Sequence, residues 1–409
     1  MIADLHCHYP MHLEADSDSN PTLEEMLRAW RTRHPRPLLR GLLMDVASRV
    51  ANYRSWSSGR RVDIPKMRDG DVRLGFSVLL DPEAEFEPDH WGDPPQADYV
   101  ARVIRLLQEV EAVVSDDEDG ACVAHNREEL DRGLDAGQVV LVHCIEGGFH
   151  LGADDDQIAA TVEKLANCGV VYVTLAHLFW RGVASDANAF PFLSDRLYDR
   201  VFGDHPGGLT ELGKTAVREM AKNRVLIDVS HMDDRAIDAT FDLLDTEVDP
   251  EKKVPVVATH AGTRQGEKPM AYNVSRKTVE RIAERDGVVG MIMGDHIMTD
   301  GIWPDRQDEG RRSKSFDESI DVLCRHIDQV NEWSGRPFRH VGIGTDLDGF
   351  IKPTLAEIET AWDMKRVELA LARRYKPDEV ELICSGNALR LLRDYVWSEP
   401  KGPCEIEPA

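Results

Sequence analysis

Several features of membrane-bound and nucleic-acid-binding proteins are missing from this sequence. No apolar run approaches the length of about 18 residues that a membrane-spanning helix needs. The first residues, Met1 to Asp4, carry no basic segment, so no signal peptide is visible. The 49 lysines and arginines are outnumbered by 74 aspartates and glutamates. The resulting net charge of -25 argues against nucleic acid or an anionic membrane surface as a partner.

Paired cysteines are also missing. The seven cysteines are odd in number, scattered along the chain and without any C-x-x-C spacing. Disulfide frameworks belong to oxidising compartments and usually show an even number of cysteines. We therefore predict seven reduced thiols in a cytoplasmic protein.

The sequence does contain eight short apolar segments rich in β-branched residues. They start near residues 2, 72, 139, 170, 225, 254, 287 and 340, and helical patterns separate nearly all of them. Eight such units predict a (β/α)8 TIM barrel, an α/β fold with its active residues at the carboxyl ends of the strands. We predict one domain over residues 1–396, with extra C-terminal helices over 355–374 and 377–395, and a polar tail over 397–409.

Long polar segments interrupt this pattern after several strands. Residues 9–37, 81–97, 178–208 and 294–315 are too long for plain connections and predict loops that cover the C-terminal face of the barrel. Within and after the first of them we expect a short helix over 23–32 and another over 38–52.

The first strand ends in His6-Cys7-His8. Residues two apart on a strand point to the same side, so both imidazoles can reach one metal ion. Cys7 should face the other way as a small packed thiol. Two further strands, 225–231 and 254–260, each stop at a histidine, His231 and His260.

The strand over 139–146 ends in Glu146 followed by two glycines. An ionised carboxylate at the end of a buried strand is costly unless it is paired or binds a cation. We therefore assign Glu146 a functional role, and give His143 and His150 structural roles. His177 and Asp346 also end strands.

Together these side chains form a set typical of metal hydrolases. Imidazole and carboxylate ligands suit zinc or a related divalent ion. Two ions that share a bridging carboxylate can hold a hydroxide between them as the nucleophile. We predict that His6 and His8 bind one ion, that His231 and His260 bind the other, and that Glu146 bridges them. Asp346 then carries the proton to the leaving amine, and His177, if it is not itself a ligand, hydrogen-bonds the oxyanion.

The chain resembles the renal (membrane) dipeptidases, peptidase family M19, among the amidohydrolase-like barrels. The resemblance runs from the first strand almost to the C-terminus. Its motifs are Glu146-Gly147-Gly148, Leu175-Ala176-His177, Gly208 to Gly213, Ile227 to His231, Thr259-His260, Gly342 to Gly349 and Gly386-Asn387. The resemblance implies a binuclear zinc site that cleaves dipeptides, including some with a C-terminal D-residue, and it places the ligand, acid/base and carbonyl-binding roles on the residues assigned above.

The sequence departs from the family pattern twice. The first motif is usually His-x-Asp, whereas His8 stands here in place of the carboxylate. The family holds the substrate carboxylate partly through an arginine before an Asn-Val pair, whereas Tyr272 precedes Asn273-Val274 here. We expect Tyr272 to contact the substrate, with Arg264 or Arg276 as candidate replacements for the arginine.

Two other functions compete with a dipeptidase. Asp4 to His8 is similar to the start of a polymerase-and-histidinol-phosphatase-type phosphoesterase, but no basic cluster beside the ligands indicates phosphate binding. A non-catalytic, metal-stabilised binding protein would not need the proton carrier Asp346. We expect a dipeptide-like small molecule as the substrate, and a homodimer is a candidate assembly.

Overall fold

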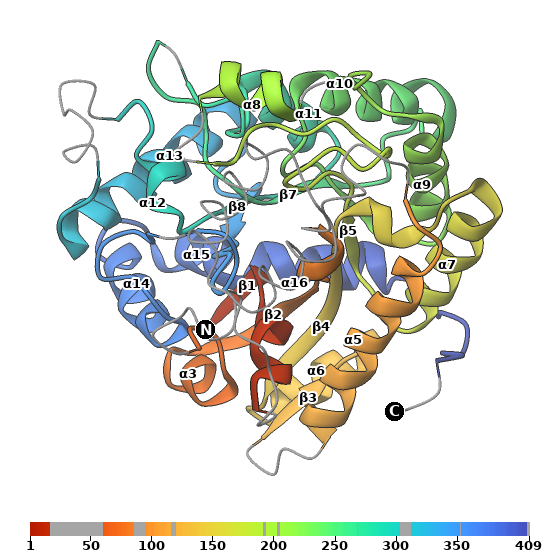
Figure 1. The fold of residues 1–409 in the computed structure, drawn as a ribbon. Coiled ribbons are helices and arrows are strands. Elements are labelled where there is room, and N and C mark those ends of the chain that lie inside the picture. Colours follow the sequence, from red (N-terminus) through yellow and green to blue (C-terminus); the bar gives the residue numbers. More distant parts are fainter. Residues whose placement is uncertain are drawn as a thin grey trace.

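The computed structural model of this chain describes residues 1–16, 60–85, 95–115, 120–190, 194–202, 205–267, 269–302, 312–351 and 353–406. The helices expected over 23–32 and 38–52 lie outside these ranges. At the centre is a closed barrel of parallel strands (Figure 1). Its strands are β1 (Ile2–Cys7), β2 (Val72–Leu79), β4 (Val139–Glu146), β5 (Tyr172–Thr174), β6 (Leu226–Asp228), β7 (Val256–Ala261), β8 (Val289–Met291) and β9 (Val341–Ile343).

The pairing between strands confirms the predicted TIM barrel. Each strand pairs in parallel with its neighbours, and the β1–β9 and β2–β4 pairs complete the ring. All eight predicted strands are present. A ninth, β3 (Ala121–Val123), pairs with the first half of β4 and was not expected from the sequence.

Helices between the strands surround the barrel (Figure 1). The longer ones are α5 (Tyr99–Ser115), α6 (Arg127–Asp135), α7 (Asp155–Asn167), α9 (Glu211–Lys222), α10 (Asp234–Leu243), α11 (Arg276–Glu284) and α13 (Phe316–Ser334). Several begin at a side-chain cap that accepts from the backbone N–H three residues later, as Asp154, Thr210 and Asp233 do. Within the described residues, no helix is both long enough and apolar enough to span a membrane.

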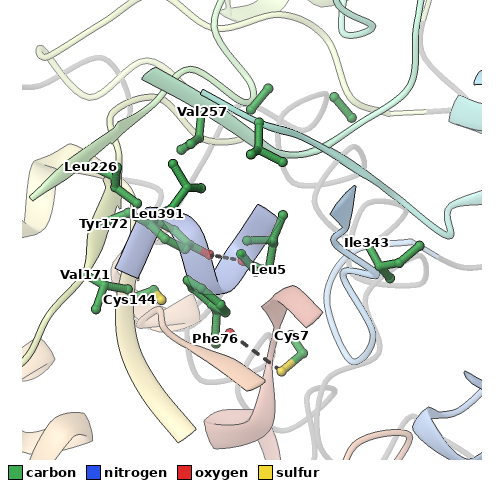
Figure 2. Packing of buried hydrophobic residues seen from close by; sticks show 14 of the residues in the cluster. Leu5, Cys7, Phe76, Cys144, Val171, Tyr172, Leu226, Val257, Ile343 and Leu391 are labelled. Atoms are coloured by element: carbon green, nitrogen blue, oxygen red, sulfur yellow. Dashed lines mark hydrogen bonds between the residues drawn. The ribbon is translucent and has the colours of Figure 1, made fainter. Parts of the chain in front are cut away.

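The C-terminal helical segment closes the end of the barrel where the strands begin. It consists of α15 (Pro377–Glu381), η8 (Leu382–Gly386), α16 (Asn387–Leu391) and η9 (Leu392–Val396). The Asn387 side-chain amide donates to the carbonyls of Phe338 (2.7 Å) and Val341 (2.8 Å), at the start of β9. Leu391 lies among the barrel side chains Leu5, Phe76 and Tyr172 (Figure 2).

The other expected C-terminal helix is shorter than predicted. It begins at η7 (Ala361–Asp363) and continues as α14 (Met364–Leu371), so residues 355–360 are not helical. The Asp363 carboxylate fixes this later start, because it accepts from the backbone N–H (2.9 Å) and the hydroxyl (3.2 Å) of Thr360.

The segment after β5 covers the C-terminal face as expected. It contains α8 (Asp195–Phe202) and a small apolar cluster of Leu178, Phe179, Phe190 and Tyr198. The Tyr198 hydroxyl donates to the carbonyl of Leu178 (2.6 Å), which ties the segment to its own beginning. A short helix after β2, α4 (Pro82–Glu85), lies in the second expected loop.

The prediction of seven reduced thiols is wrong for two of them. Cys168, at the end of α7, forms a disulfide with Cys404 in the C-terminal tail. The two cysteines are 236 residues apart in the sequence, so no local spacing could predict the pair. Cys7, Cys122, Cys144, Cys324 and Cys384 are free. The division between domain and tail at residue 396 stays a prediction.

Candidate active site

Polar side chains converge where six barrel strands end. β1 leads to His6 and His8, β4 to Glu146, β5 to His177, β6 to His231, β7 to His260 and β9 to Asp346. All of these side chains are buried. Possible ligand atoms lie within 4.8 Å of one another in three overlapping groups: His6, Glu146 and His260; His6, His8 and Asp346; and Glu146, His177 and His231.

Glu146 is at the centre of this cluster. Its Oε1 lies 3.4 Å from Nε2 of His6, His231 and His260. Its Oε2 lies 3.4 Å from His8 Nε2 and 3.3 Å from His177 Nε2. Burial alone would raise the pKa of Glu146, but the surrounding imidazoles outweigh burial and hold the pKa well below its usual value. The carboxylate is therefore ionised inside the protein.

The unsatisfied atoms of this cluster fit divalent metal ions. Glu146 is 1% exposed, and neither of its carboxylate oxygens has a hydrogen-bond partner in the structure. Nε2 of His6 has none either. Buried polar atoms without partners are rare in native proteins and call for an explanation such as an ion. Nitrogen and oxygen ligands that face one another at these distances suit zinc-type ions.

A layer of hydrogen bonds behind the histidines sets their tautomers. The Thr259 hydroxyl donates to Asp228 Oδ2 (2.6 Å), so its oxygen remains free to accept from imidazole N–H groups. Nδ1 of His260 lies 3.0 Å from this hydroxyl, and Nδ1 of His6 lies 3.2 Å from it. With the proton on Nδ1, each Nε2 presents its lone pair to the Glu146 side of the site. Such outer hydrogen bonds orient metal-binding histidines.

The backbone is strained at two of the strand ends. His231 and Asp346 have φ values of 65° and 57°, in the left-handed region that few non-glycine residues adopt. Asp346 Oδ1 lies 3.0 Å from His8 Nε2 and 3.8 Å from His6 Nε2. Gly349 packs directly against this carboxylate, because a Cβ there would lie 1.9 Å from Asp346 Oδ1. The loop geometry thus presents the carboxylate at the edge of the histidine cluster.

His177 has a second carboxylate partner that the sequence did not reveal. Its Nδ1 lies 3.3 Å from Oε2 of Glu85, which is fully buried at the end of α4. Burial lowers the pKa of His177, but the charges of Glu146 and Glu85 outweigh burial and raise it to about 9. Glu85 is one acidic residue among many in the loop over 81–97, so only its position in space marks it.

Tyr272 lies beside the histidine cluster, but its hydroxyl is bonded within the protein. The hydroxyl donates to the His260 carbonyl (3.0 Å), and the ring packs edge-on against His231 with centroids 4.9 Å apart. A pocket above the histidines is lined by Tyr272 together with Leu178, Ala189, Ile297, Phe350 and Ile351. Among the residues that the structure describes, no lysine or arginine lines this pocket.

Neither candidate replacement for the missing arginine reaches this pocket. Arg264 donates to both carboxylate oxygens of Asp234 (2.8 Å each) and to backbone carbonyls. Arg276 is exposed and pairs with Glu280 on α11 (3.0 Å). Both guanidinium groups are engaged elsewhere, so neither candidate replacement lies in the pocket in this structure.

The chain is similar to proteins that are named as dipeptidases. The chain is 25% identical over 295 residues to "Dipeptidase tcpJ" of Claviceps purpurea (strain 20.1), covering 71% of this chain. That alignment spans 58% of the relative's length. It is also 22% identical to "Dipeptidase 3" of Mus musculus, over 92% of this chain and 67% of the relative.

Solved structures show the same fold. A metallo peptidase from Rhodobacter sphaeroides, liganded with a phosphinate mimic of the dipeptide L-Ala-D-Ala, aligns with a TM-score of 0.66 and 19% identity over 97% of this chain and 99% of its own. The probable dipeptidase PvdM from Pseudomonas aeruginosa aligns with a TM-score of 0.61 and 20% identity, over 83% and 90%.

A family model described as "Membrane dipeptidase (Peptidase family M19)" matches residues 1–398. The match covers almost the whole chain, and it does not favour the phosphoesterase or the silent binding protein. This chain belongs to the membrane dipeptidase family, peptidase family M19.

Proposed function

We propose that this protein is a metal-dependent hydrolase that cleaves the amide bond of dipeptides or dipeptide-like small molecules, with two divalent ions, Zn²⁺ above all, as cofactors. The observation that carries the proposal is the buried carboxylate of Glu146, faced by five imidazole nitrogens at 3.3–3.4 Å and left without a hydrogen bond. A fully buried anion in this setting needs a cation.

Five residues would hold the ions. His6 and His8 approach from β1, His231 and His260 approach from β6 and β7, and Glu146 lies between the two pairs. The proximity of His231 Nε2 to His260 Nε2 (2.9 Å) is consistent with two nitrogens directed at one ion. When bound, such ions would activate a water molecule at neutral pH and polarise the substrate carbonyl.

Asp346 is the proposed proton carrier. As the water oxygen bonds to the carbonyl carbon, Asp346 takes a proton from the water. It returns the proton to the nitrogen as the C–N bond breaks, so the amine leaves neutral. The Asp346 carboxylate is held near Nε2 of His6 and His8, at the edge of the ligand cluster.

His177 is the proposed partner of the developing oxyanion. Its Nε2 faces the Glu146 side of the site, and Glu85 behind its Nδ1 favours the imidazolium, which can donate to negative charge. Glu85 then acts as a positioning residue, since it reaches the substrate only through His177.

The pocket supports a substrate whose terminal carboxylate is held only weakly. Its described lining is apolar apart from the catalytic groups, and no guanidinium lies there to pair with a terminal carboxylate. A charge-assisted hydrogen bond contributes about 1.5–3 kcal/mol, so its loss lowers the binding affinity about 10- to 100-fold. We therefore expect little preference for free dipeptides over their C-terminal amides.

A substrate panel tests this function. The purified protein, loaded with Zn²⁺, is offered dipeptides, the matching C-terminal amides and phosphomonoesters, and kcat/KM is measured for each. Hydrolysis of dipeptides and amides at similar rates supports the proposal. Cleavage of phosphomonoesters alone would favour the phosphoesterase, and no turnover of any compound would favour the binding protein.

The cytoplasmic location and the homodimer stay predictions. The Cys168–Cys404 disulfide is an argument against the cytoplasmic location, because structural disulfides persist mainly in oxidising compartments. Thiol labelling of protein isolated directly from its host tests the location.

A further inference from the structure

A second group of possible metal ligands lies outside the barrel. It consists of Glu111 on α5, His125 just after β3, and His143 on β4, whose ligand atoms all lie within 4.8 Å of one another. His143 and Glu146 are three residues apart on the same strand, so their side chains point to opposite faces. His143 therefore faces the helical layer, and this cluster is separate from the active site.

One carboxylate oxygen joins the two imidazoles. Oε1 of Glu111 lies 2.7 Å from Nε2 of His125 and 2.7 Å from Nε2 of His143. His143 is fully buried, and its Nδ1 has no hydrogen-bond partner. Three ligand atoms from three separate elements are thus directed at one small volume.

A further carboxylate orients His125 from behind. Oε2 of Glu129, on α6, lies 2.8 Å from Nδ1 of His125 and accepts from its backbone N–H (2.9 Å). The Asn126 side chain accepts from the backbone N–H of Glu129, which fixes the start of α6. With its proton on Nδ1, His125 turns the lone pair of Nε2 toward Glu111 and His143. This carboxylate–histidine arrangement is the one found behind metal-binding histidines.

The cluster needs a proton or a metal ion between its facing ligand atoms. A lone pair on His125 Nε2 and the ionised Glu111 oxygen would repel each other at 2.7 Å unless a proton or a metal ion lies between them. The side chains of Glu111 and His125 are 30% and 33% exposed, so an ion has access from solvent. Two imidazoles and one carboxylate, with water in the remaining position, form a ligand set that zinc accepts.

We propose that Glu111, His125 and His143 form a further divalent-metal site, of the Zn²⁺ class, that fastens α5 and the segment after β3 to the outer face of β4. The site is structural and does not depend on the chemistry proposed for the barrel mouth. It would brace the elements that carry the active site, since α5 packs against η4 (Gly148–Leu151), directly after Glu146, through Tyr99 and Phe149 (ring centroids 5.5 Å apart).

Metal titration in a background without barrel-mouth ions tests the proposal. Glu146→Gln protein is stripped with a chelator and titrated with Zn²⁺, and bound metal is measured after dialysis. We expect one equivalent to remain bound in this background, and we expect Glu111→Gln or His125→Gln to remove it. Glu128→Gln is the matched control, because Glu128 is exposed and adjacent to Glu129 on α6.

A milder variant tests the site in case the loss of a ligand causes the protein to misfold. Glu129→Gln keeps every proposed ligand and removes only the carboxylate behind His125, so Zn²⁺ affinity at this site should fall about 10- to 100-fold. Thermal unfolding with and without Zn²⁺ supplies a readout independent of activity. If no equivalent of Zn²⁺ stays bound, or if Glu111→Gln and His125→Gln bind Zn²⁺ as tightly as Glu128→Gln, the proposal is overturned, and the cluster holds a proton instead. Wild-type dipeptide turnover reports on the barrel-mouth function separately.

Discussion

The hydroxyl of Thr259 donates a 2.6 Å hydrogen bond to Asp228 while its oxygen faces Nδ1 of both His6 and His260. Asp228 is fully buried and also accepts from the Thr174 hydroxyl (2.6 Å). This threonine therefore helps to orient two proposed ligands that are far apart in the sequence.

Replacing Thr259 should weaken metal binding without removing a ligand. We expect Thr259→Val to lower Zn²⁺ affinity about 10- to 100-fold, because Nδ1 of His260 loses its acceptor and Nδ1 of His6 keeps only the Tyr172 hydroxyl (2.8 Å). Competition with a chelator measures the affinity. Thr240→Val is the matched control, since Thr240 is also buried but donates to the Ala236 carbonyl within α10 (2.8 Å). Equal affinities in the two variants would contradict the orienting role.

Asp346 should matter to turnover more than to metal content. As a general acid/base it contributes on the order of 10²–10⁴-fold in rate, and Asp346→Asn should lose that factor in kcat while keeping its ions. Because Asp346 also lies within ligand distance of His6 and His8, the two roles need separating. Loss of an ion in Asp346→Asn would make it a ligand, and wild-type kcat would remove it from the mechanism.

Glu85 should act through His177. We expect Glu85→Gln to keep both ions and lower kcat about 10- to 100-fold, as loss of an outer carboxylate typically does. Its charge helps to raise the pKa of His177 to about 9, so its removal should shift the alkaline limb of the kcat profile to lower pH. Glu85→Asp should restore part of both. His177→Ala should likewise keep metal, and metal loss there would make His177 a ligand instead.

The outer cluster predicts a pH dependence of stability in metal-free protein. The hydrogen bond between His125 and Glu111 and the neighbouring carboxylate of Glu129 raise the pKa of His125 from 6.5 to about 9, although burial alone would lower it. A raised histidine pKa contributes stability that is complete below about pH 6.5 and lost as the pH rises through about 9. The melting temperature of the metal-free protein, relative to His125→Gln, should therefore fall across this window. A pH-independent difference would contradict it.

The strands and most ligands could be predicted because their signals are local. The alternation of His6 and His8 and the apolar runs that end at His231 and His260 belong to single strands, and strand ends meet at one face of a parallel barrel. The roles assigned to these residues stay predictions until metal and rate are measured.

Other features depend on contacts between distant segments. Glu85 meets His177, and Cys168 meets Cys404, only through the folded barrel, and no spacing in the sequence links either pair. The apolar run around β3 ends at Ala124 and holds a single β-branched residue, Val123, so it does not predict a strand. His143 was assigned a structural role from β4 alone, because its partners Glu111 and His125 lie elsewhere in the chain.

The central claim is that Glu146 bridges two metal ions that perform hydrolysis, and the most direct measurement is the metal content of wild type and Glu146→Gln beside their dipeptide turnover. Glu146→Gln is nearly isosteric, and circular dichroism checks its fold. The account predicts that the variant holds two fewer ions per chain than wild type and has no measurable turnover. Equal metal content in the two folded proteins, or wild-type turnover in the variant, would contradict it.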